Sequence, residues 1–294
     1  MAEKEGVKME KNYNVDIPFK TNGNFHVKGG ANLDWGMKKR LSSIFNVKSG
    51  NTVIFSFDHG YNMGPISGLE RLDLLIPQLM DHVDVLLATR GSLRTCVKPN
   101  FKKGIALRVS AGSSMLNDDL SREIVSVDIE DAIRMNADCM AVQVFVGARG
   151  QLLSINNLSK VINAGAGYSI PTLGVIAVGK NIERTSQYFK LATRMIAEIG
   201  ANIVKTYYCD NLDEVAAACP VPIIVTSGKK LPEKDALTMA YKSIQSGVKG
   251  LDMGKNIFQS VNPAVMADAV GKIVHGKYTD KEAWEFFCDK TKEK

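Results

Sequence analysis

A lysine stands in the middle of a strand-like stretch, residues 202–208, where lysine is an unusual residue. Ile203 and Val204 are apolar, and Lys205 follows them directly. Lysine is depleted in strands and is almost never fully buried without a partner. Partial removal from water lowers the pKa of a lysine, and its neutral amine can then attack a carbonyl and form a Schiff base. Lys205 is therefore a candidate Schiff-base nucleophile, and a structural ion pair is the alternative.

An acid and a histidine follow another strand-like run in the segment FSFDHG. Asp58 could pair with Lys205, orient it, or relay protons while a carbinolamine forms. A capping aspartate in a turn is the alternative. His59 is a candidate for substrate binding. The histidines show no metal-ligand spacing, so metal-dependent chemistry is poorly supported and we expect no bound metal or cofactor. They are His26, His59, His82 and His275.

Two glycine-containing turns near the end of the chain predict a phosphate site. VTSGKKLPE places Ser227 and Gly228 in a turn, and LDMGKNIFQS places Gly254 and Lys255 in another. Glycine lets backbone N–H groups approach an anion, and a lysine adds positive charge. A simple turn is the alternative for each glycine alone. Their position after the last two predicted strands favours a shared phosphate site.

The elements that must position these residues repeat along the chain from residue 51. Short β-rich runs alternate with helical patterns, which indicates parallel βαβ units. The eight predicted strands are residues 52–57, 83–89, 104–110, 139–146, 172–178, 202–207, 222–226 and 249–253. The predicted helices include 69–81, 129–136, 155–164, 182–199, 212–217 and 234–245. Eight such units predict a closed (β/α)8 barrel. An open doubly wound sheet would favour a G-x-G-x-x-G turn after its first strand, and here Asp-His-Gly follows instead.

Alternation along each strand predicts which side chains point into the barrel. Chemistry in this fold occurs at the carboxyl ends of the strands. The inward set is Ser56, Asp58, Ala106, Arg108, Gln143, Phe145, Ile203, Lys205 and Tyr207. We therefore expect Lys205 near the barrel mouth, with Tyr207 as a further catalytic candidate and with Arg108 and Phe145 as substrate-binding candidates.

This pattern divides the chain into three predicted parts. Residues 1–50 form an N-terminal extension whose segment 32–45 predicts a short helix over the barrel floor. Residues 51–275 form the barrel, and residues 276–294 form a C-terminal helical tail with Thr279 or Asp280 as N-cap. The tail carries Trp284, Phe286 and Phe287. Its apolar side could dock on its own barrel or on a neighbouring subunit.

Composition narrows the class of protein and of partner. The chain has 294 residues, of which 45% are hydrophobic and 23% are charged, as in ordinary globular proteins. No run of 18 apolar residues exists, so we expect no membrane span. The charged N-terminus does not resemble a secretory signal, and the five scattered cysteines suggest reduced thiols in a cytoplasmic protein. The net charge of +6 comes without nucleic-acid-binding motifs, so an anionic small molecule such as a phosphate ester fits better.

The ordered motifs FDHG, KTYY, GKKLPE and MGKNIFQS resemble those of the class I aldolase family of the archaeal-type fructose-bisphosphate aldolase. NLDWGMKKRLSSIFN and CPVPI extend the similarity over most of the chain. Within the family, these motifs are most similar to those of the thiolases of autoinducer-2 breakdown. The resemblance implies a (β/α)8 barrel with Lys205 as Schiff-base residue and Asp58 as its acid partner. It also implies phosphate binding at Ser227, Gly228, Gly254 and Lys255.

The resemblance further implies a reaction and an assembly. Such a thiolase cleaves 3-hydroxy-5-phosphonooxypentane-2,4-dione and passes the acetyl group to coenzyme A, with dihydroxyacetone phosphate as the other product. Coenzyme A is then the acyl acceptor, and no metal is needed. Relatives form higher oligomers, so a homo-oligomer, a pentamer or a decamer, is expected.

Three departures from the family pattern accompany the resemblance. Phe145 stands where the family has a tyrosine that acts as an acid/base in the aldolases. Phenylalanine cannot transfer a proton, which puts classical aldol cleavage in question, and Tyr207 could take the role. Ser227 replaces a glycine, and Lys255 replaces an arginine, although lysine still binds phosphate as a point charge. These changes allow for a shifted substrate.

Two other functions stay open beside the thiolase. One is a plain class I aldolase or a related sugar-phosphate synthase, and the other is a catalytically inactive barrel that binds a phosphosugar. The presence of both Lys205 and Asp58 argues against complete loss of activity. Cys209 is a weaker candidate for a thiolase nucleophile, because no histidine partner is obvious and a free cysteine is usually a small apolar filler.

Overall fold

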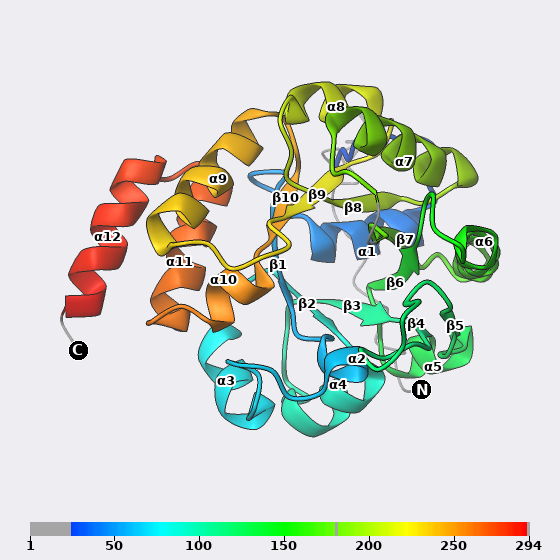
Figure 1. Cartoon of the computed structure of the whole chain (residues 1–294), viewed down its shortest axis with the longest axis horizontal. Helices are drawn as coiled ribbons and strands as arrows, with labels where there is room; N and C mark the ends of the chain where they lie inside the picture. The colour runs from blue at the N-terminus through cyan, green and yellow to red at the C-terminus, as the bar shows by residue number, and fades with distance from the viewer. Residues whose placement is uncertain (1–24, 180–181, 293–294) are drawn as a thin grey trace, which may run out of the picture.

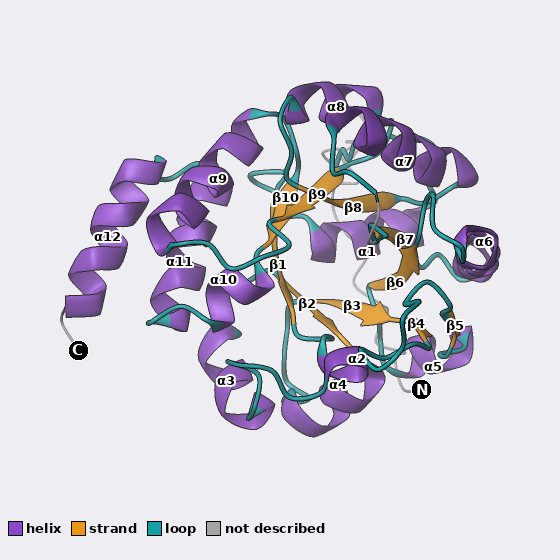
Figure 2. Cartoon of the chain, viewed as in Figure 1, coloured by secondary structure: helices purple, strands orange, loops and turns teal. Residues whose placement is uncertain are grey.

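The computed structural model describes residues 25–179 and 182–292, and its centre is a closed barrel of eight parallel strands. Around the barrel the strands follow the order β1-β10-β9-β8-β7-β6-β3-β2. Their bounds are β1 Thr52–Ser56, β2 Val85–Ala88, β3 Gly104–Arg108, β6 Cys139–Val144, β7 Thr172–Ile176, β8 Ile203–Tyr207, β9 Ile223–Thr226 and β10 Gly250–Asp252. Each of the eight predicted strands contains one of them, and the predicted (β/α)8 barrel is confirmed (Figures 1 and 2).

Helices lie between the strands and form the outer ring (Figure 2). They are α2 Gly60–Met63, α3 Leu72–Leu79, α4 Arg90–Cys96, α5 Ile129–Arg134, α6 Gln151–Gly167, α7 Ser186–Ile199, α8 Leu212–Ala218, α9 Glu233–Gln245, α10 Gly254–Phe258 and α11 Pro263–Val274. The helix predicted over 182–199 begins only at Ser186. The cause is the N-cap Thr185, whose hydroxyl accepts a hydrogen bond from the backbone N–H of Tyr188 at 3.2 Å.

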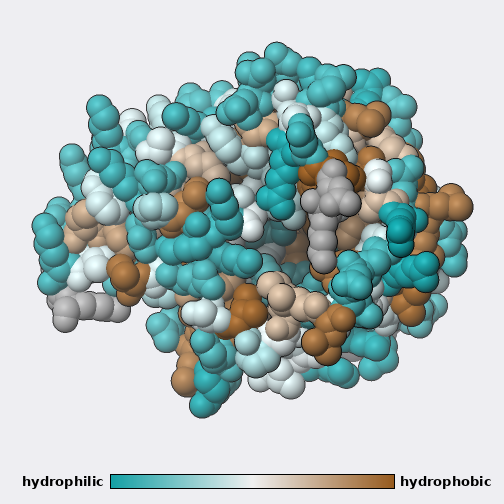
Figure 3. Space-filling view, viewed as in Figure 1, coloured by the Kyte–Doolittle hydropathy of each residue, from teal (hydrophilic) through white to brown (hydrophobic). Residues whose placement is uncertain are grey.

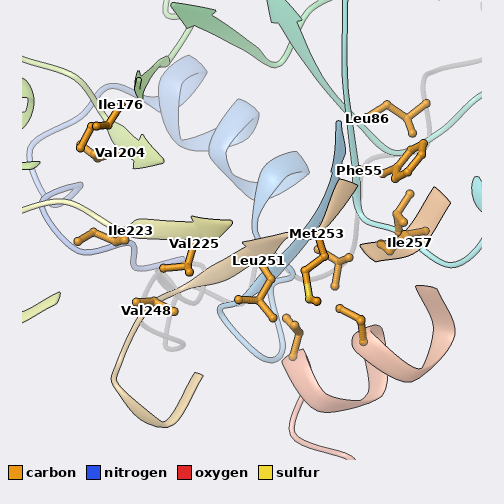
Figure 4. Close-up of a cluster of buried hydrophobic side chains, with 14 of the residues drawn as sticks. Phe55, Leu86, Ile176, Val204, Ile223, Val225, Val248, Leu251, Met253 and Ile257 are labelled. Atoms are coloured by element: carbon orange, nitrogen blue, oxygen red, sulfur yellow. The ribbon is translucent and has the colours of Figure 1, made fainter. Parts of the chain in front are cut away.

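Alternation along the strands divides the buried side chains into two layers. The outer layer packs between the barrel and its helices, and Figure 4 shows part of it, including Phe55, Leu86, Val204 and Leu251. The inner layer fills the barrel, and its strand residues are Ile54, Val85, Leu87, Ala106, Cys139, Ala141, Leu173, Val175, Ile203 and Ile224. The barrel is therefore a packed core rather than a pore.

Helix α1 (Trp35–Ile44) packs against this inner layer. Asp34 caps it, because one of its carboxylate oxygens accepts a hydrogen bond from the backbone N–H of Met37 at 2.9 Å. Met37, Leu41 and Ile44 are buried among the inner strand residues. The helix thereby covers one end of the barrel and leaves the carboxyl ends of the strands as the accessible end.

Helix α12 (Asp280–Lys292) follows the barrel and packs against α9 and α11 of the same chain (Figure 1). Thr279 and Glu282 form a capping box, in which each side chain accepts a hydrogen bond from the other's backbone N–H. Phe287 is buried, and its ring stacks on Trp284 with centroids 5.8 Å apart. In the described part of the chain, no helix combines the length and apolarity needed to cross a bilayer.

A small antiparallel hairpin, which the sequence did not predict, stands beside the barrel mouth. Its strands are β4 Ser110–Ala111 and β5 Ile124–Val125. The connection between them carries Glu123, which is 2% exposed. The hairpin thus brings a buried acid to the carboxyl end of β3.

Candidate active site

A cavity of about 230 Å³ opens at the carboxyl ends of the strands, where the space-filling view shows the surface hollowed near the barrel axis (Figure 3). The structure brings nine of the ten predicted site residues into its wall. They are Asp58, His59, Arg108, Lys205, Tyr207, Ser227, Gly228, Gly254 and Lys255. These residues come from segments far apart in the sequence, and barrel closure alone assembles them.

Lys205 lies on β8 and points into this cavity, and its closest contacts are Asp252 and Ser56. Its Nζ donates a short hydrogen bond to Oδ2 of Asp252 and lies 3.2 Å from Oγ of Ser56. Ser56 also donates to the same carboxylate oxygen. The side chain of Asp252 is 1% exposed and that of Lys205 is 13% exposed, so the carboxylate is buried while the amine remains accessible from the cavity. The strand register explains the contact. Lys205 and Gly250 are both level with Ile224 on the intervening β9, and Asp252 lies two residues farther along β10, where the long lysine side chain reaches it.

The charge state of Lys205 differs from the sequence-based expectation. Burial lowers its pKa, as expected, but the Asp252 carboxylate raises it, with a further contribution from Asp58. The net result is a pKa above the ordinary lysine value of 10.5. The free amine is therefore a protonated ammonium at neutral pH, and the amine must transfer a proton before it attacks a carbonyl.

Asp58 contacts a different cation from the one expected. The prediction that Asp58 is the direct partner of Lys205 is wrong, since its Oδ2 accepts a hydrogen bond from Nη1 of Arg108 at 3.0 Å. The side chain of Arg108 is buried at the end of β3 and needs anionic neighbours there. Asp58 acts on Lys205 only through its field across the cavity, while Asp252 makes the contact.

Arg108 is the centre of a buried polar network. Its Nη2 donates to Glu123 at 2.8 Å and to the Tyr61 hydroxyl at 2.6 Å, and it also contacts Oε1 of Gln143. The Tyr61 hydroxyl in turn donates to Glu123. Burial raises the pKa of Tyr61, Arg108 opposes that rise, and Glu123 adds to it. Tyr61 therefore stays protonated and presents a phenol beside the reacting centre.

His59 follows Asp58 and borders both the cavity and α10. Its Nδ1 lies 3.9 Å from Oδ1 of Asp58 and has no hydrogen-bond partner within the described residues. Burial lowers its pKa below 6.5, although the Asp58 carboxylate opposes this shift. His59 is thus a neutral imidazole at neutral pH, which can accept or donate one proton.

The predicted phosphate residues form the wall of the cavity contributed by β9 and β10. Gly228 has φ of +75°, and a Cβ there would lie 2.7 Å from the ring of Tyr207. Only glycine fits this position without strain. Asn256 ties the two loops together, since its amide nitrogen donates to Oγ of Ser227 and to the carbonyl of Lys229. Lys255 supplies the positive charge at this side of the cavity.

Phe145 points toward the mouth but lines a different cavity. This second cavity, of about 530 Å³, shares Asn62, Gln143 and Tyr207 with the Lys205 cavity. Phe145 is 5% exposed. Tyr207 lines both cavities, and the guanidinium of Arg184 lies over its ring, 4.2 Å from the ring centroid.

Cys209 shows no sign of a reactive thiolate. It is 7% exposed, and burial, followed by the neighbouring Asp210, raises its pKa to about 11. A thiolate nucleophile needs a lowered pKa instead. Among the described residues, no group of three or more potential metal-ligating side chains is close enough to hold an ion.

Sequence reasoning missed three residues of the site. Asp252 could have been found, because it is the next-to-last residue of the predicted strand 249–253, two residues before Gly254. Tyr61 and Glu123 lie outside the predicted strands, and no local pattern marks either of them. Their place depends on α2 and on the β4–β5 hairpin.

Comparisons with known proteins agree with the barrel fold and the aldolase resemblance. The sequence profile described as "DeoC/LacD family aldolase" matches residues 52–260. An uncharacterized aldolase from Pasteurella multocida is 46% identical over 290 residues, covering 98% of this chain and 99% of the relative. A 3-hydroxy-5-phosphonooxypentane-2,4-dione thiolase from Photorhabdus laumondii is 48% identical over 288 residues, covering 98% of each chain.

Among solved structures, an archaeal fructose 1,6-bisphosphate aldolase superposes with a TM-score of 0.73. The match covers 82% of this chain and 99% of the aldolase at 19% identity, and it supports the fold alone. The full-length sequence similarity and the matched profile go further and confirm the resemblance drawn from the motifs. The chain is an enzyme that belongs to the DeoC/LacD family of aldolases.

Proposed function

We propose that the protein is an acetyltransferase that cleaves 3-hydroxy-5-phosphonooxypentane-2,4-dione and transfers its acetyl group to coenzyme A, in autoinducer-2 breakdown. The observation that carries the proposal is Lys205, in contact with Asp252 in a cavity that is also lined by Ser227, Gly228, Gly254 and Lys255, which we call the phosphate cradle, and that adjoins a second cavity. The thiolase name of relatives 46–48% identical to this chain supports the choice of substrate. A homo-oligomer in the cytoplasm is part of the same proposal.

The cradle fixes one end of the substrate. Gly228 and Gly254 let the backbone come close to a phosphate, and Lys255 neutralises part of its charge. The phosphate is attached to C5 of the pentanedione, so the ketone at C4 then reaches Lys205. Binding energy from the phosphate holds this carbon in place for attack.

Lys205 must first lose a proton, and Asp252 is the acceptor in contact with it. The amine attacks C4, and the carbinolamine loses water to give an iminium. Ser56, which is hydrogen-bonded to the same carboxylate, and Asp58, whose charge reaches the site, are placed to assist this proton transfer. The neutral imidazole of His59 and the phenol of Tyr207 also line the cavity.

The iminium then acts as an electron sink. The thiolate of coenzyme A attacks the C2 carbonyl, the C2–C3 bond breaks, and its electron pair moves to the iminium nitrogen as an enamine. C3 takes up the proton that the thiol released, and water hydrolyses the new iminium. The products are acetyl-coenzyme A, dihydroxyacetone phosphate and the free Lys205 amine, so no net water is consumed.

Product analysis with and without coenzyme A tests this function. The purified protein should convert the phosphorylated pentanedione to acetyl-coenzyme A and dihydroxyacetone phosphate only when coenzyme A is present. Cleavage to the same extent without coenzyme A would favour the plain aldolase. No cleavage, together with no borohydride-trapped adduct from dihydroxyacetone phosphate, would favour the inactive binding barrel.

A further inference from the structure

We infer that the second cavity, beside Phe145, receives the thiol arm of the acyl acceptor. This inference rests on the proposed acetyl transfer and assigns a place to its second substrate. The cavity has a volume of about 530 Å³ and adjoins the Lys205 cavity through Asn62, Gln143 and Tyr207. A chain that enters it can therefore present its end to a group bound at Lys205.

The position of the bond to be broken requires a site on this side. The phosphate end of the substrate lies toward the β9 and β10 loops, at Gly228 and Lys255. The acetyl carbon lies on the opposite side of the iminium carbon, so the thiol must approach from the side away from that cradle. The second cavity is built by segments that follow β6 and β7, including Ala148 and Ala177, and it shares none of the phosphate residues.

The lining fits a slim and largely neutral arm. Its apolar wall consists of Phe145, Ala148, Ala177, Val178 and Ile182. Such a wall, with a few polar groups, is typical of sites that bind uncharged chains. A pantetheine arm has this character, because it joins short alkyl segments through amides and ends in a thiol.

The charges at this cavity disfavour the substrate of a bisphosphate aldolase. Among the described residues of its lining, Asp118, Asp119 and Glu123 are acidic and Arg149 is the one cation. Glu123 is already paired with Arg108, so a second phosphate placed here would meet two further carboxylates for one guanidinium, and their repulsion would weaken its binding. A neutral arm meets no such repulsion, and its own phosphates would lie outside the cavity.

Filling the cavity tests the inference. Ala148 is half-buried and lines the cavity, so a larger side chain at this position should take up part of its volume. We expect Ala148→Phe to raise KM for coenzyme A about 10-fold or more, and to raise KM for the short thiol N-acetylcysteamine likewise. KM for the dione and the amount of borohydride-trapped dihydroxyacetone phosphate should change less than about two-fold.

Two further variants complete the test. Ala31→Phe makes the same substitution at an exposed alanine just before α1, away from the mouth, and should leave both KM values unchanged. If Ala148→Phe does not fold, Ile182→Ala replaces it, because it removes part of the wall and should also raise KM for both thiols. If the wild type transfers acetyl groups but the KM values for both thiols are unchanged in Ala148→Phe, or in Ile182→Ala where it takes its place, the subsite is overturned and the proposed function stands. A wild type that transfers no acetyl group to coenzyme A overturns both.

Discussion

Lys205 and Asp252, on strands separated by β9, form a buried ion pair at the mouth of the barrel. Ser56 hydrogen-bonds to the same carboxylate oxygen. The carboxylate keeps the lysine charged in the free enzyme, and the same contact provides the acceptor for the proton that the amine must lose. A bound substrate that enters this contact therefore meets a nucleophile and its base as one unit.

Neutralising Asp252 should move the pH dependence of Schiff-base formation. Burial lowers the pKa of Lys205, and Asp252 is the largest of the groups that raise it, so Asp252→Asn should leave burial with much less opposition. Trapping with borohydride and dihydroxyacetone phosphate, measured as a function of pH, has a midpoint at which half of the lysine is trapped. We expect this midpoint pH to be lower in the variant than in the wild type. Turnover should still decrease, because the proton acceptor is lost. Asp235→Asn, at an exposed position on α9, should move neither quantity, and an upward shift in Asp252→Asn would contradict the assignment.

The same ion pair makes a prediction about stability. The folded-state pKa of Lys205 is raised, so its contribution is complete below the unfolded-state pKa near 10.5 and is lost as the pH rises through the folded-state value. Urea titrations at increasing alkaline pH should therefore show a steeper loss of stability for the wild type than for Lys205→Met. Parallel curves for the two proteins would mean that the pair is not linked to folding.

Lys205→Met should abolish the covalent chemistry and leave the phosphate site intact. Methionine keeps a similar length and tolerates an irregular, partly apolar position. Turnover should fall by several orders of magnitude, because positioning alone cannot replace covalent catalysis. Mass spectrometry after borohydride reduction should find the substrate on the wild-type peptide that contains Lys205. An adduct on Lys229 or Lys230 instead would reject the assignment.

Lys255→Ala should weaken substrate binding more than it slows the chemical step. The phosphate is remote from the bond that breaks, and a charge-assisted hydrogen bond contributes about 1.5–3 kcal/mol, so KM for the dione should rise roughly 10- to 100-fold. Steady-state kinetics measure the change, and Lys281→Ala on the exposed side of α12 provides the matched control. A loss confined to kcat would argue against a phosphate at this loop.

Arg108→Gln should destabilise the fold. The change leaves Asp58 and Glu123 buried without their cation, which costs about 3–5 kcal/mol. Chemical denaturation of the variant and the wild type measures this loss. Arg90→Gln, whose partner Asp131 is accessible to water, should cost less than about 1 kcal/mol.

The strand period, the glycine turns and the motifs were enough to predict the barrel, the inward Lys205 and the two glycine-containing loops that line its cavity. Each of these depends on local sequence: a period of two sets which side chains point inward, and glycine marks turns that other residues would strain. Ser227, Gly228, Gly254 and Lys255 lie in one wall because the carboxyl ends of neighbouring parallel strands meet at one edge.

Only the tertiary structure decided which acid contacts the lysine. Asp58 and Asp252 both point toward the mouth, and the sequence favoured Asp58. The stagger of the closed barrel brings Asp252 to Lys205, while buried Arg108 attracts Asp58. Glu123 reaches that arginine through a hairpin that no local pattern predicted. Contacts between segments this far apart depend on barrel closure and on pairing every buried charge, and neither is set by local sequence.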